Sequence, residues 1–372
     1  MEYLFTFKPL EPWFFGEEKN FGFDNFKNEN ERIIKNNYFI KSGRMPSQST
    51  IIGAIRYLIL KKKNILSKNS VILDEDQKKY IGDTSFDLKK ENQTFGKIKK
   101  IGPIHLYDGE EEYFRIPYCL KISNDVIQAY EMQKKGKRNN KEMLLPKNYN
   151  AKEGLVDGFI SVSNGIHYKK SKDIFDGITK TRILKNSRNE SDKREDAFFK
   201  KQYMYFKDEK WSFCCKVELE DDIDIDINKK DTVYMGQDKS LFVCVIEKKN
   251  TEINELEDKL KEIINISIEG YTTAISISDL YLTEAYEKFA SYAIVKYKSF
   301  RYMASSHNVD KNDLQQTYYN RLKKSELFYL IESGSVFYIS DDKIEEFKSL
   351  CDKKIGNTGF NTMIYLGKGK KK

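Results

Sequence analysis

Histidine, cysteine and long apolar runs are scarce in this sequence, and each scarcity narrows what the chain can be. Among 372 residues only three are histidine and five are cysteine. The cysteines are Cys119, Cys214, Cys215, Cys244 and Cys351. They are odd in number, scattered and free of any Cys-x-x-Cys pair, so the spacing predicts neither a zinc site nor a disulfide framework. We interpret all five as reduced packing residues.

No apolar run approaches the roughly 20 residues that a membrane-spanning helix requires. The first residues, Met-Glu-Tyr-Leu-Phe-Thr-Phe, lack the basic and apolar regions of a secretory signal. These two observations predict a cytoplasmic protein with no membrane partner.

Signatures of catalysis and cofactor binding are also missing. The sequence contains no Gly-x-Gly-x-x-Gly or Walker motif and no evident Ser/His/Asp set. The alternating acidic run of residues 221–226 lacks the turn glycine and terminal glutamate of a calcium loop. An acidic edge that resists strand pairing, or that meets a basic partner, explains the run better. We therefore expect no metal, no cofactor and no catalytic residues.

Charge and aromatic residues are what the sequence has in abundance. Charged residues make up 33% of the chain, aromatic residues make up 13%, and the formal net charge is +8. The net charge alone favours an acidic partner only weakly, because a Lys- and Asn-rich composition also follows from AT-rich coding. Cations are concentrated in residues 168–201. Cations can follow phosphates while neighbouring aromatic rings, here Tyr168, Phe175 and Tyr203, stack on unpaired bases.

Hydrophobic periodicity predicts many short strands and few helices. In the first part we expect a strand at 2–9, a helix at 50–62, a hairpin of 98–107 and 113–122, an exposed loop at 134–150, a hairpin of 198–206 and 211–218, and a strand at 241–247 after the loop at Gly236. In the second part we expect a helix at 252–264, strands at 274–286 and 293–303, a hairpin at 327–339, a helix at 342–351, and a strand at 362–366 after the loop of Gly356 and Gly359. Both parts thus end with a glycine loop and an apolar strand.

This order suggests an α+β fold in which a β-α-β-β-α-β, ferredoxin-like unit occurs twice in tandem with large insertions. The predicted domains are residues 1–250 and 251–372. In the first unit the second helix is not evident from the sequence.

The segment of residues 10–60 is the most informative part of the chain. It contains the hydroxyl-rich sequence Pro46-Ser-Gln-Ser-Thr-Ile-Ile-Gly-Ala-Ile-Arg56 at the start of the expected helix. On a helical wheel Arg56 lies at the edge of the apolar face, where an unpaired charge would be too costly to keep. Its guanidinium must therefore meet a carboxylate, carbonyl groups or a phosphate. Because helix N-termini and arginines both bind phosphate well, a polyanion is expected here.

These motifs resemble the RAMP superfamily of CRISPR-associated proteins. The matching residues are 9–15, with Pro-Leu-Glu-Pro-Trp-Phe-Phe; 46–56; 181–205 in degenerate form; and the Gly-Ser-Val hairpin at 333–338. More narrowly, they resemble the subunit of the Cmr complex (the type III-B effector) that holds the repeat-derived 5′ handle of the guide RNA (crRNA). The resemblance implies two RRM-like RAMP domains. The glycine loops depart from the family pattern, which leaves the equivalent subunit of a type III-A or III-D complex open.

The resemblance also implies roles for individual residues. Ser47, Ser49 and Thr50 would offer hydroxyl and N–H groups to a handle phosphate, and Arg44 and Arg56 would pair with phosphate or brace the loop. Lys180, Arg182 and Lys185 would belong to an extended β-hairpin laid on the RNA. Gly236, Gly356 and Gly359 would let the backbone approach the RNA closely. For Arg56 an internal brace is nearly as good an explanation as RNA contact.

The function that the resemblance implies is non-catalytic: RNA binding that links the large palm-domain subunit to the backbone subunits, with target RNA met only indirectly. One alternative is a guide-processing endoribonuclease, because some RAMP proteins cut RNA with a histidine. Of the three histidines, His105 is expected to be a packing or sheet-surface residue, His167 precedes a lysine pair, and His307 lies in a polar stretch. A scaffold without RNA contact is the second alternative.

Overall fold

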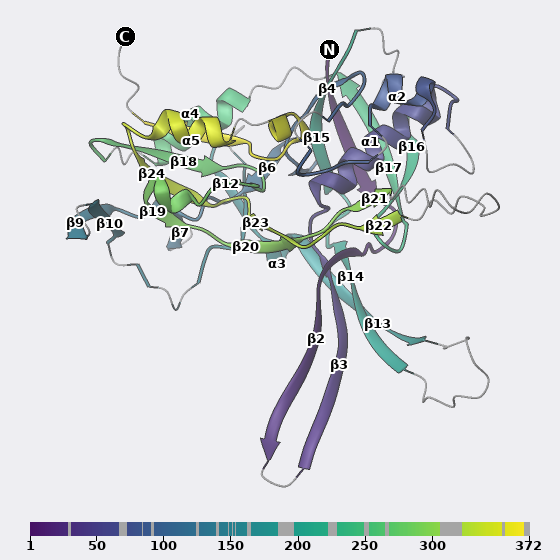
Figure 1. Ribbon diagram of the computed structural model, residues 1–372, viewed down its shortest axis with the longest axis horizontal. Helices are drawn as coiled ribbons and strands as arrows, with labels where there is room; N and C mark the ends of the chain where they lie inside the picture. The colour runs from purple at the N-terminus through teal and green to yellow at the C-terminus, as the bar shows by residue number, and fades with distance from the viewer. Residues whose placement is uncertain are drawn as a thin grey trace, which may run out of the picture.

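The computed structural model describes most of the chain (Figure 1). The described residues are 1–28, 31–66, 73–83, 85–90, 93–123, 126–138, 141–147, 149–150, 152, 154–161, 165–184, 197–221, 229–248, 253–264, 268–305, 322–351 and 354–367. The fold is mixed α/β, with many strands and few helices, as the hydrophobic pattern predicts.

The elements up to the first glycine loop are mostly strands. They are β1 (Glu2–Pro9), β2 (Phe15–Asn28), β3 (Glu31–Gly43), α1 (Gln48–Lys62), α2 (Glu75–Ile81), β4 (Ile98–Ile101), β5 (His105–Tyr107), β6 (Glu112–Arg115), β7 (Leu120–Ser123), β8 (Val126–Ala129), β9 (Met132–Arg138), β10 (Lys141–Pro146), β11 (Gly158–Ser161), β12 (His167–Lys170), α3 (Ser171–Ile174), β13 (Phe175–Leu184), β14 (Ala197–Phe206), β15 (Ser212–Leu219), β16 (Asp231–Met235) and β17 (Ser240–Lys248).

The remaining elements, from residue 253 onward, are again mostly short strands. They are α4 (Ile253–Ile263), β18 (Tyr271–Ser276), the 3₁₀ turn η2 (Tyr286–Lys288), β19 (Ala290–Ile294), β20 (Tyr297–Phe300), β21 (Met303–Ser305), β22 (Leu322–Lys324), β23 (Phe328–Ile331), β24 (Val336–Ser340), α5 (Ile344–Cys351), the 3₁₀ turn η3 (Lys354–Thr358) and β25 (Met363–Leu366).

The larger sheet contains the first strand, β1, in its interior. Its strand order is β12-β11-β6-β5-β15-β1-β17-β16, with β4 also paired to β15, and β1 is antiparallel to both β15 and β17. Along β17 the side chains alternate, so that Phe242, Cys244 and Ile246 are buried while the residues between them are less buried. The apolar face of α1, including Ile55 and Leu58, joins the core that this sheet forms.

The second sheet has the order β19-β24-β18-β25 and lies toward the C-terminus of the chain. Every neighbouring pair in it is antiparallel. The amphipathic helix α5 places Phe347 against Phe337 of β24, with ring centroids 5.3 Å apart. This aromatic contact helps to bury one face of the second sheet.

Two long hairpins project from the body on the same side of the molecule (Figure 1). β2 pairs antiparallel with β3, β13 pairs antiparallel with β14, and β14 pairs parallel with β3, which joins the hairpins into one four-stranded sheet. At its base the second hairpin is fixed by Asp238, whose carboxylate lies 2.6 Å from Lys201 Nζ and accepts a hydrogen bond from Tyr203. The loop after β16 thereby holds the hairpins to the body.

The hydrophobic cores extend across the middle of the chain. Phe300, Leu330 and Phe360 belong to the same core as α1 and β1. Conversely, Ile116 and Leu120 pack with residues of the second sheet such as Ile275. Among the described residues, two of the three core clusters contain residues from both sides of residue 250, whereas the third, with Phe337 and Phe347, lies wholly on the C-terminal side. The boundary between residues 250 and 251 stays a prediction.

Several expectations need correction. Residues 134–150, expected to be an exposed loop, include the paired strands β9 and β10. The segment of residues 198–218 does not fold on itself, because β14 pairs with β13 and β3 while β15 pairs with β1, β4 and β5. The chain does turn after residue 331, but β23 pairs with β20 and β24 pairs with β18 and β19. In the last two cases a strand that is distant in the sequence competes successfully with the adjacent strand.

Other expectations are confirmed. β5 and β6 form a hairpin around Asp108 and Gly109, and α1, α4 and α5 lie close to their predicted positions. All five cysteines are buried, in agreement with packing roles, and burial raises the pKa of the Cys119 thiol to about 12. Among the helices within the described ranges, none combines the length and apolar composition that crossing a membrane requires. The acidic run at 222–226 lies outside the described residues.

Candidate nucleic-acid interface

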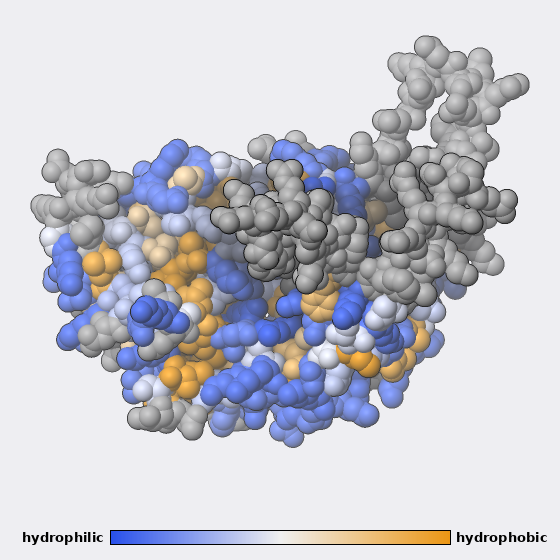
Figure 2. Space-filling view, turned by 90° about the horizontal axis from the view of Figure 1, so that it is seen from below, coloured by the Kyte–Doolittle hydropathy of each residue, from blue (hydrophilic) through white to orange (hydrophobic). Residues whose placement is uncertain are grey.

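A large open groove runs between the start of α1, the bases of the two hairpins, and the β20–β23 ribbon of the C-terminal part. Its volume is about 1980 Å³. Sites for small ligands usually enclose about 300–1,000 Å³, so this groove is better matched to a polymer. Figure 2 views the face from which the hairpins project, where hydrophilic residues border hydrophobic ones around a hollowed centre.

Positive charge dominates the groove. Eleven of its described lining residues are lysine or arginine, whereas three are aspartate or glutamate. The cations are Lys41, Arg44, Arg56, Arg115, Lys172, Lys207, Lys239, Lys296, Lys298, Arg301 and Lys324. The acids are Asp176, Asp279 and Glu332. Such an excess of one sign in a concave surface focuses the field and attracts a polyanion.

The hydroxyl-rich start of α1 lies in one wall of the groove, as the sequence suggests. Ser47 is the N-cap residue, and its hydroxyl accepts a hydrogen bond from the Thr50 N–H at 3.3 Å. The Ser47 hydroxyl also lies 3.0 Å from that of Ser49 and 2.9 Å from that of Thr50. These three partly buried hydroxyls form one cluster with Ser47 at its centre.

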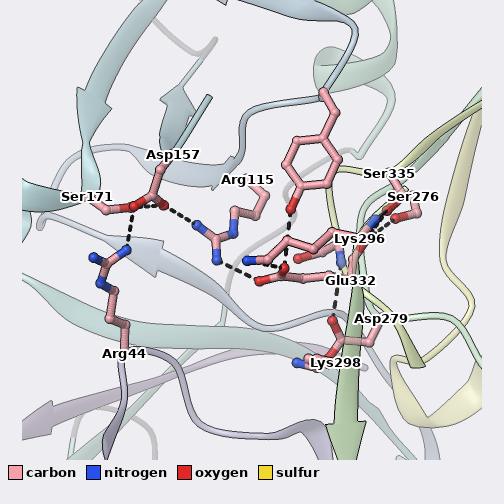
Figure 3. A network of polar contacts seen from close by, with 12 residues as sticks. Arg44, Arg115, Asp157, Ser171, Ser276, Asp279, Lys296, Lys298, Glu332 and Ser335 are labelled. Carbon is pink, nitrogen blue, oxygen red and sulfur yellow. Dashed lines mark hydrogen bonds and ion pairs between the residues drawn. The ribbon is translucent and has the colours of Figure 1, made fainter. Parts of the chain in front are cut away.

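Arg44 is held in the groove by a chain of ion pairs (Figure 3). Its guanidinium lies 2.5 Å from Asp157, whose other carboxylate oxygen accepts hydrogen bonds from Ser171 at 2.7 Å and from Arg115 at 2.8 Å. Arg115 also contacts Glu332 at 2.9 Å. The chain of contacts therefore runs from the loop before α1 to the turn after β23.

The same network continues into the C-terminal wall. Glu332 accepts a hydrogen bond from Tyr118 at 3.3 Å and lies 2.8 Å from Lys296 Nζ, while Lys298 pairs with Asp279 (Figure 3). Burial by itself raises the pKa of Glu332, but Arg115 and Lys296 outweigh burial and hold that pKa below its usual value. Glu332 is therefore ionised at neutral pH and stabilises cations on both sides of the groove.

Exposed aromatic residues also face the groove. Tyr234 on β16, Tyr297 on β20 and Tyr329 on β23 line it and are 63%, 52% and 65% exposed. These tyrosines, and the cations of β20 and its surroundings, were not identified from the sequence. The available signal was the alternation of aromatic and basic residues in Lys296-Tyr-Lys-Ser-Phe-Arg301. That alternation reads equally well as an ordinary surface strand.

Arg56 is buried and donates a hydrogen bond from Nη2 to the backbone carbonyl of Asp83. Burial lowers the pKa of Arg56 to about 10, against the raising effect of the Asp83 carboxylate. The contact present is thus the internal brace between α1 and the segment after α2. Contact with a phosphate at the groove stays a prediction for this residue.

The glycines at 236 and 359 allow close approach of the chain to itself. Gly236 has φ +81°, and a Cβ there would meet the carbonyl oxygen of Phe14 at 2.4 Å. Gly359 has φ +85°, and a Cβ there would meet the Gly102 carbonyl oxygen at 2.4 Å. Gly236 lines the groove, whereas Gly356 lies within η3 and a Cβ there would meet only open space. Access of RNA to these backbones stays a prediction.

The predicted hairpin cations are only partly described. Lys180 is exposed on β13, with its ammonium 5.1 Å from the centroid of the Tyr203 ring. The backbone of Arg182 pairs with Phe199 in the same hairpin, while Lys185 lies outside the described residues. Tyr203 and Phe175, expected as stacking partners, are each only 4% exposed and belong to the protein interior. That expectation is corrected, because β13–β14 folds these rings onto the body.

The histidines show no arrangement typical of a nuclease within the described part of the chain. His105 is buried, stacks on Phe114 with centroids 4.5 Å apart, and lies 3.0 Å from Glu112. This confirms the packing role expected for it. His167 is exposed on β12, and His307 lies outside the described residues. Across the described ranges no cluster of three His, Cys, Asp or Glu side chains is placed to hold a metal ion.

The sequence matches the family model described as CRISPR-associated protein (Cas_Cmr3) over residues 5–366. A chain from the cryo-EM structure of the Type III-B Cmr-beta bound to cognate target RNA is 14% identical, with a TM-score of 0.46, covering 98% of this chain and 96% of that chain. A chain from the structure that also contains AMPPnP (state 1) is 14% identical, with a TM-score of 0.44, covering 97% of this chain and 95% of that one. No curated protein matches the sequence. The family match spans nearly the whole chain and confirms the resemblance seen in the motifs: this chain belongs to the Cas_Cmr3 family of CRISPR-associated proteins.

Proposed function

We propose that the chain is the non-catalytic RNA-binding subunit of a type III-B (Cmr) interference complex and that it grips the 5′ handle of the crRNA. In that complex it would link the large palm-domain subunit to the backbone subunits in the cytoplasm, with target RNA met indirectly. The mechanism is positioning: phosphate contacts fix the register of the guide, and unpaired handle bases provide selectivity.

The observation that carries this proposal is the charge of the groove, with eleven cations and three acids among its described lining residues. Lys172, Lys207 and Lys239 are exposed there and project from three different segments. A single-stranded phosphate backbone passing along the groove would meet cations on both walls. The groove also contains Arg44, Ser47, Ser49 and Thr50, so the predicted handle contacts lie on the same path.

We further propose that both units are ferredoxin-like RAMP domains. In support, the strand orders β17-β1-β15-β5 and β25-β18-β24-β19 correspond to each other, with the first strand of each unit in the centre and antiparallel neighbours. This is the arrangement expected of a split β-α-β pair. In chain order β16 stands between β15 and β17, where the second helix of the first unit would be expected, and it pairs with β17 at the edge of the sheet.

The test uses anisotropy of a fluorescent RNA that carries the repeat-derived handle, titrated with the full chain at several salt concentrations. Replacing Lys172, Lys207 and Lys239 with glutamate should weaken binding and reduce the salt slope by about 0.7 for each lost phosphate contact. Matched replacements of Lys100, Lys135 and Lys248, which are exposed but outside the groove lining, should leave the slope unchanged.

Equal effects of both sets would show non-specific attraction to net charge and would refute the groove as the RNA site. Incubation of the same RNA with the pure chain tests the endoribonuclease alternative. Site-specific cleavage that His167→Ala or His307→Ala abolishes would replace the non-catalytic proposal.

A further inference from the structure

The β20–β23 ribbon has two faces of opposite character. Register pairs Tyr297 with Ile331, Lys298 with Leu330, Ser299 with Tyr329 and Phe300 with Phe328. Paired residues in an antiparallel ribbon point to the same face. The face of Leu330, Phe300 and Phe328 is buried in the main core, whereas the face of Tyr297 and Tyr329 opens into the groove.

On the open face the two tyrosines are diagonal neighbours. Tyr297 lies opposite Ile331, two residues from Tyr329 on the partner strand, and such diagonal positions are about 7–8 Å apart. Ser299, between them on the face, is too small to cover either ring. The side chain of Tyr286 makes a hydrogen bond with that of Tyr297.

The surroundings of these rings favour a nucleic acid over a protein as the occupant. Lys296, Lys298, Arg301 and Lys324 all line the same groove, and the register places Lys298 on the opposite face of the ribbon from Tyr297. Cores of protein–protein interfaces are depleted in charged residues, whereas sites for single-stranded nucleic acid combine a basic groove with exposed aromatic rings. The exposed rings of Tyr297 and Tyr329 can stack on unpaired bases while the neighbouring cations bind phosphates.

We propose that Tyr297 and Tyr329 form a stacking platform for two unpaired bases of single-stranded RNA, on the wall of the groove opposite α1. The spacing of the platform is about twice the 3.4 Å rise per nucleotide of a stacked helix. The two bases are consequently splayed apart, one on each ring, while cations of the groove lining, such as Arg301 and Lys324, bind the phosphates. This inference rests on the proposed RNA-binding function. It assigns base contacts to Tyr297 and Tyr329, which lie outside the motifs identified in the sequence.

The experiment measures the affinity of the full chain for two probes with the same number of phosphates: an oligoadenylate about twelve nucleotides long and its abasic analogue. Tyr329→Ala and Tyr297→Ala should each weaken binding of oligoadenylate by about five- to a hundredfold and leave the abasic strand unaffected. Tyr329→Phe, which retains the ring and loses only the hydroxyl, should bind oligoadenylate like the wild type. Val126→Ala, an exposed apolar residue away from the groove, is the surface control.

The possible outcomes distinguish failure of the stacking proposal from failure of the proposed RNA-binding function. If the tyrosine variants bind both probes like the wild type while the groove-lysine variants do not, RNA binding stands and the platform is refuted. Equal losses for oligoadenylate and the abasic strand also refute stacking, because the rings would then act on the backbone or on folding. If the wild type binds neither probe nor handle RNA, the proposed function itself fails. Loss of assembly with a protein subunit and unchanged RNA affinity would assign the tyrosines to a protein interface instead.

Discussion

Arg115 is the residue that connects the two walls of the groove. Its guanidinium contacts Asp157 at 2.8 Å and Glu332 at 2.9 Å, and it lies 5.3 Å from the centroid of the Phe159 ring. The Arg115 and Glu332 side chains are largely buried, so removing Arg115 takes the buried partner away from Glu332 and leaves that carboxylate only Lys296, whose side chain is 57% exposed.

Arg115→Met should therefore lower the free energy of unfolding by about 3 kcal/mol, as measured by urea denaturation. Adding Glu332→Gln in the same chain should recover part of that loss, because no uncompensated carboxylate then remains at the centre of the network. Strictly additive losses in the double variant would show that the two groups are not coupled.

The same network predicts how stability depends on pH. The folded chain holds the pKa of Glu332 below its ordinary value of 4.5, so the stabilisation is complete above that value and is lost as pH falls through the lower folded pKa. Wild-type and Arg115→Met stabilities should thus converge when denaturation is repeated from neutral pH into acid. A difference that persists or grows in acid would contradict the pairing.

The sequence predicted some properties of individual residues but not their contact partners, as Arg56, Tyr297 and Tyr329 show. The position of Arg56 on the helix predicted that it needs a polar partner. The sequence did not identify that partner, because the Asp83 carbonyl lies in a segment without recognisable hydrophobic periodicity. Tyr297 and Tyr329 are far from the matched motifs around residue 50. Only the pairing of β20 with β23 brings them together, and pairing across 30 residues leaves no local signature.

At the scale of elements, α1 depends on a loop near the end of the chain. Gln48 in the first turn of α1 donates a hydrogen bond to the Gly102 carbonyl at 3.0 Å, and Gly359 packs against both groups. The loop can reach them because Gly359 adopts a positive φ that side chains with a Cβ rarely allow.

Gly359→Ala should destabilise the protein by about 1–3 kcal/mol and weaken RNA binding through displacement of the start of α1. Gly356→Ala is the matched control in the same loop, because its Cβ would meet open space and its φ is not positive. Thermal unfolding of the two variants measures the difference. Similar melting temperatures would show that the loop does not support α1.

Elements were predictable where a local pattern sufficed. The amphipathic spacing of α4 and α5 and the Asp-Gly turn between β5 and β6 each specify an element with little help from the rest of the chain.

The pairing partners of the strands could not be predicted from local patterns. β14 and β15 are neighbours in the chain, but β15 pairs with β1 because burial of Phe213 and Phe242 on either side of the first strand favours that sheet. The β2–β3 hairpin was missed because its sequence is polar and lacks clear alternation.

At the scale of the whole molecule, two of the three hydrophobic cores among the described residues combine residues from both sides of the predicted domain boundary. Phe360, near the C-terminus, is fully buried and stacks on Phe86 with centroids 5.7 Å apart. It also contacts the Phe300 ring at 5.8 Å. The described parts of the chain should therefore unfold together.

Phe360→Ala should lower the free energy of unfolding by about 3–5 kcal/mol and should do so for the whole chain in a single transition. Calorimetry distinguishes the possibilities, since one shifted peak indicates shared cores. Two peaks, of which only one moves, would instead support independent units on either side of residue 250.

The most direct test of the central claim is photocrosslinking in the assembled complex, with a reactive nucleotide placed at successive positions of the guide RNA. The groove account predicts that positions in the 5′ handle crosslink to residues of the groove, such as those around Ser47, Lys239 and Tyr329, and that positions farther along the guide do not. Crosslinks of the 5′ handle that fall on another subunit, with none on this chain, would contradict it.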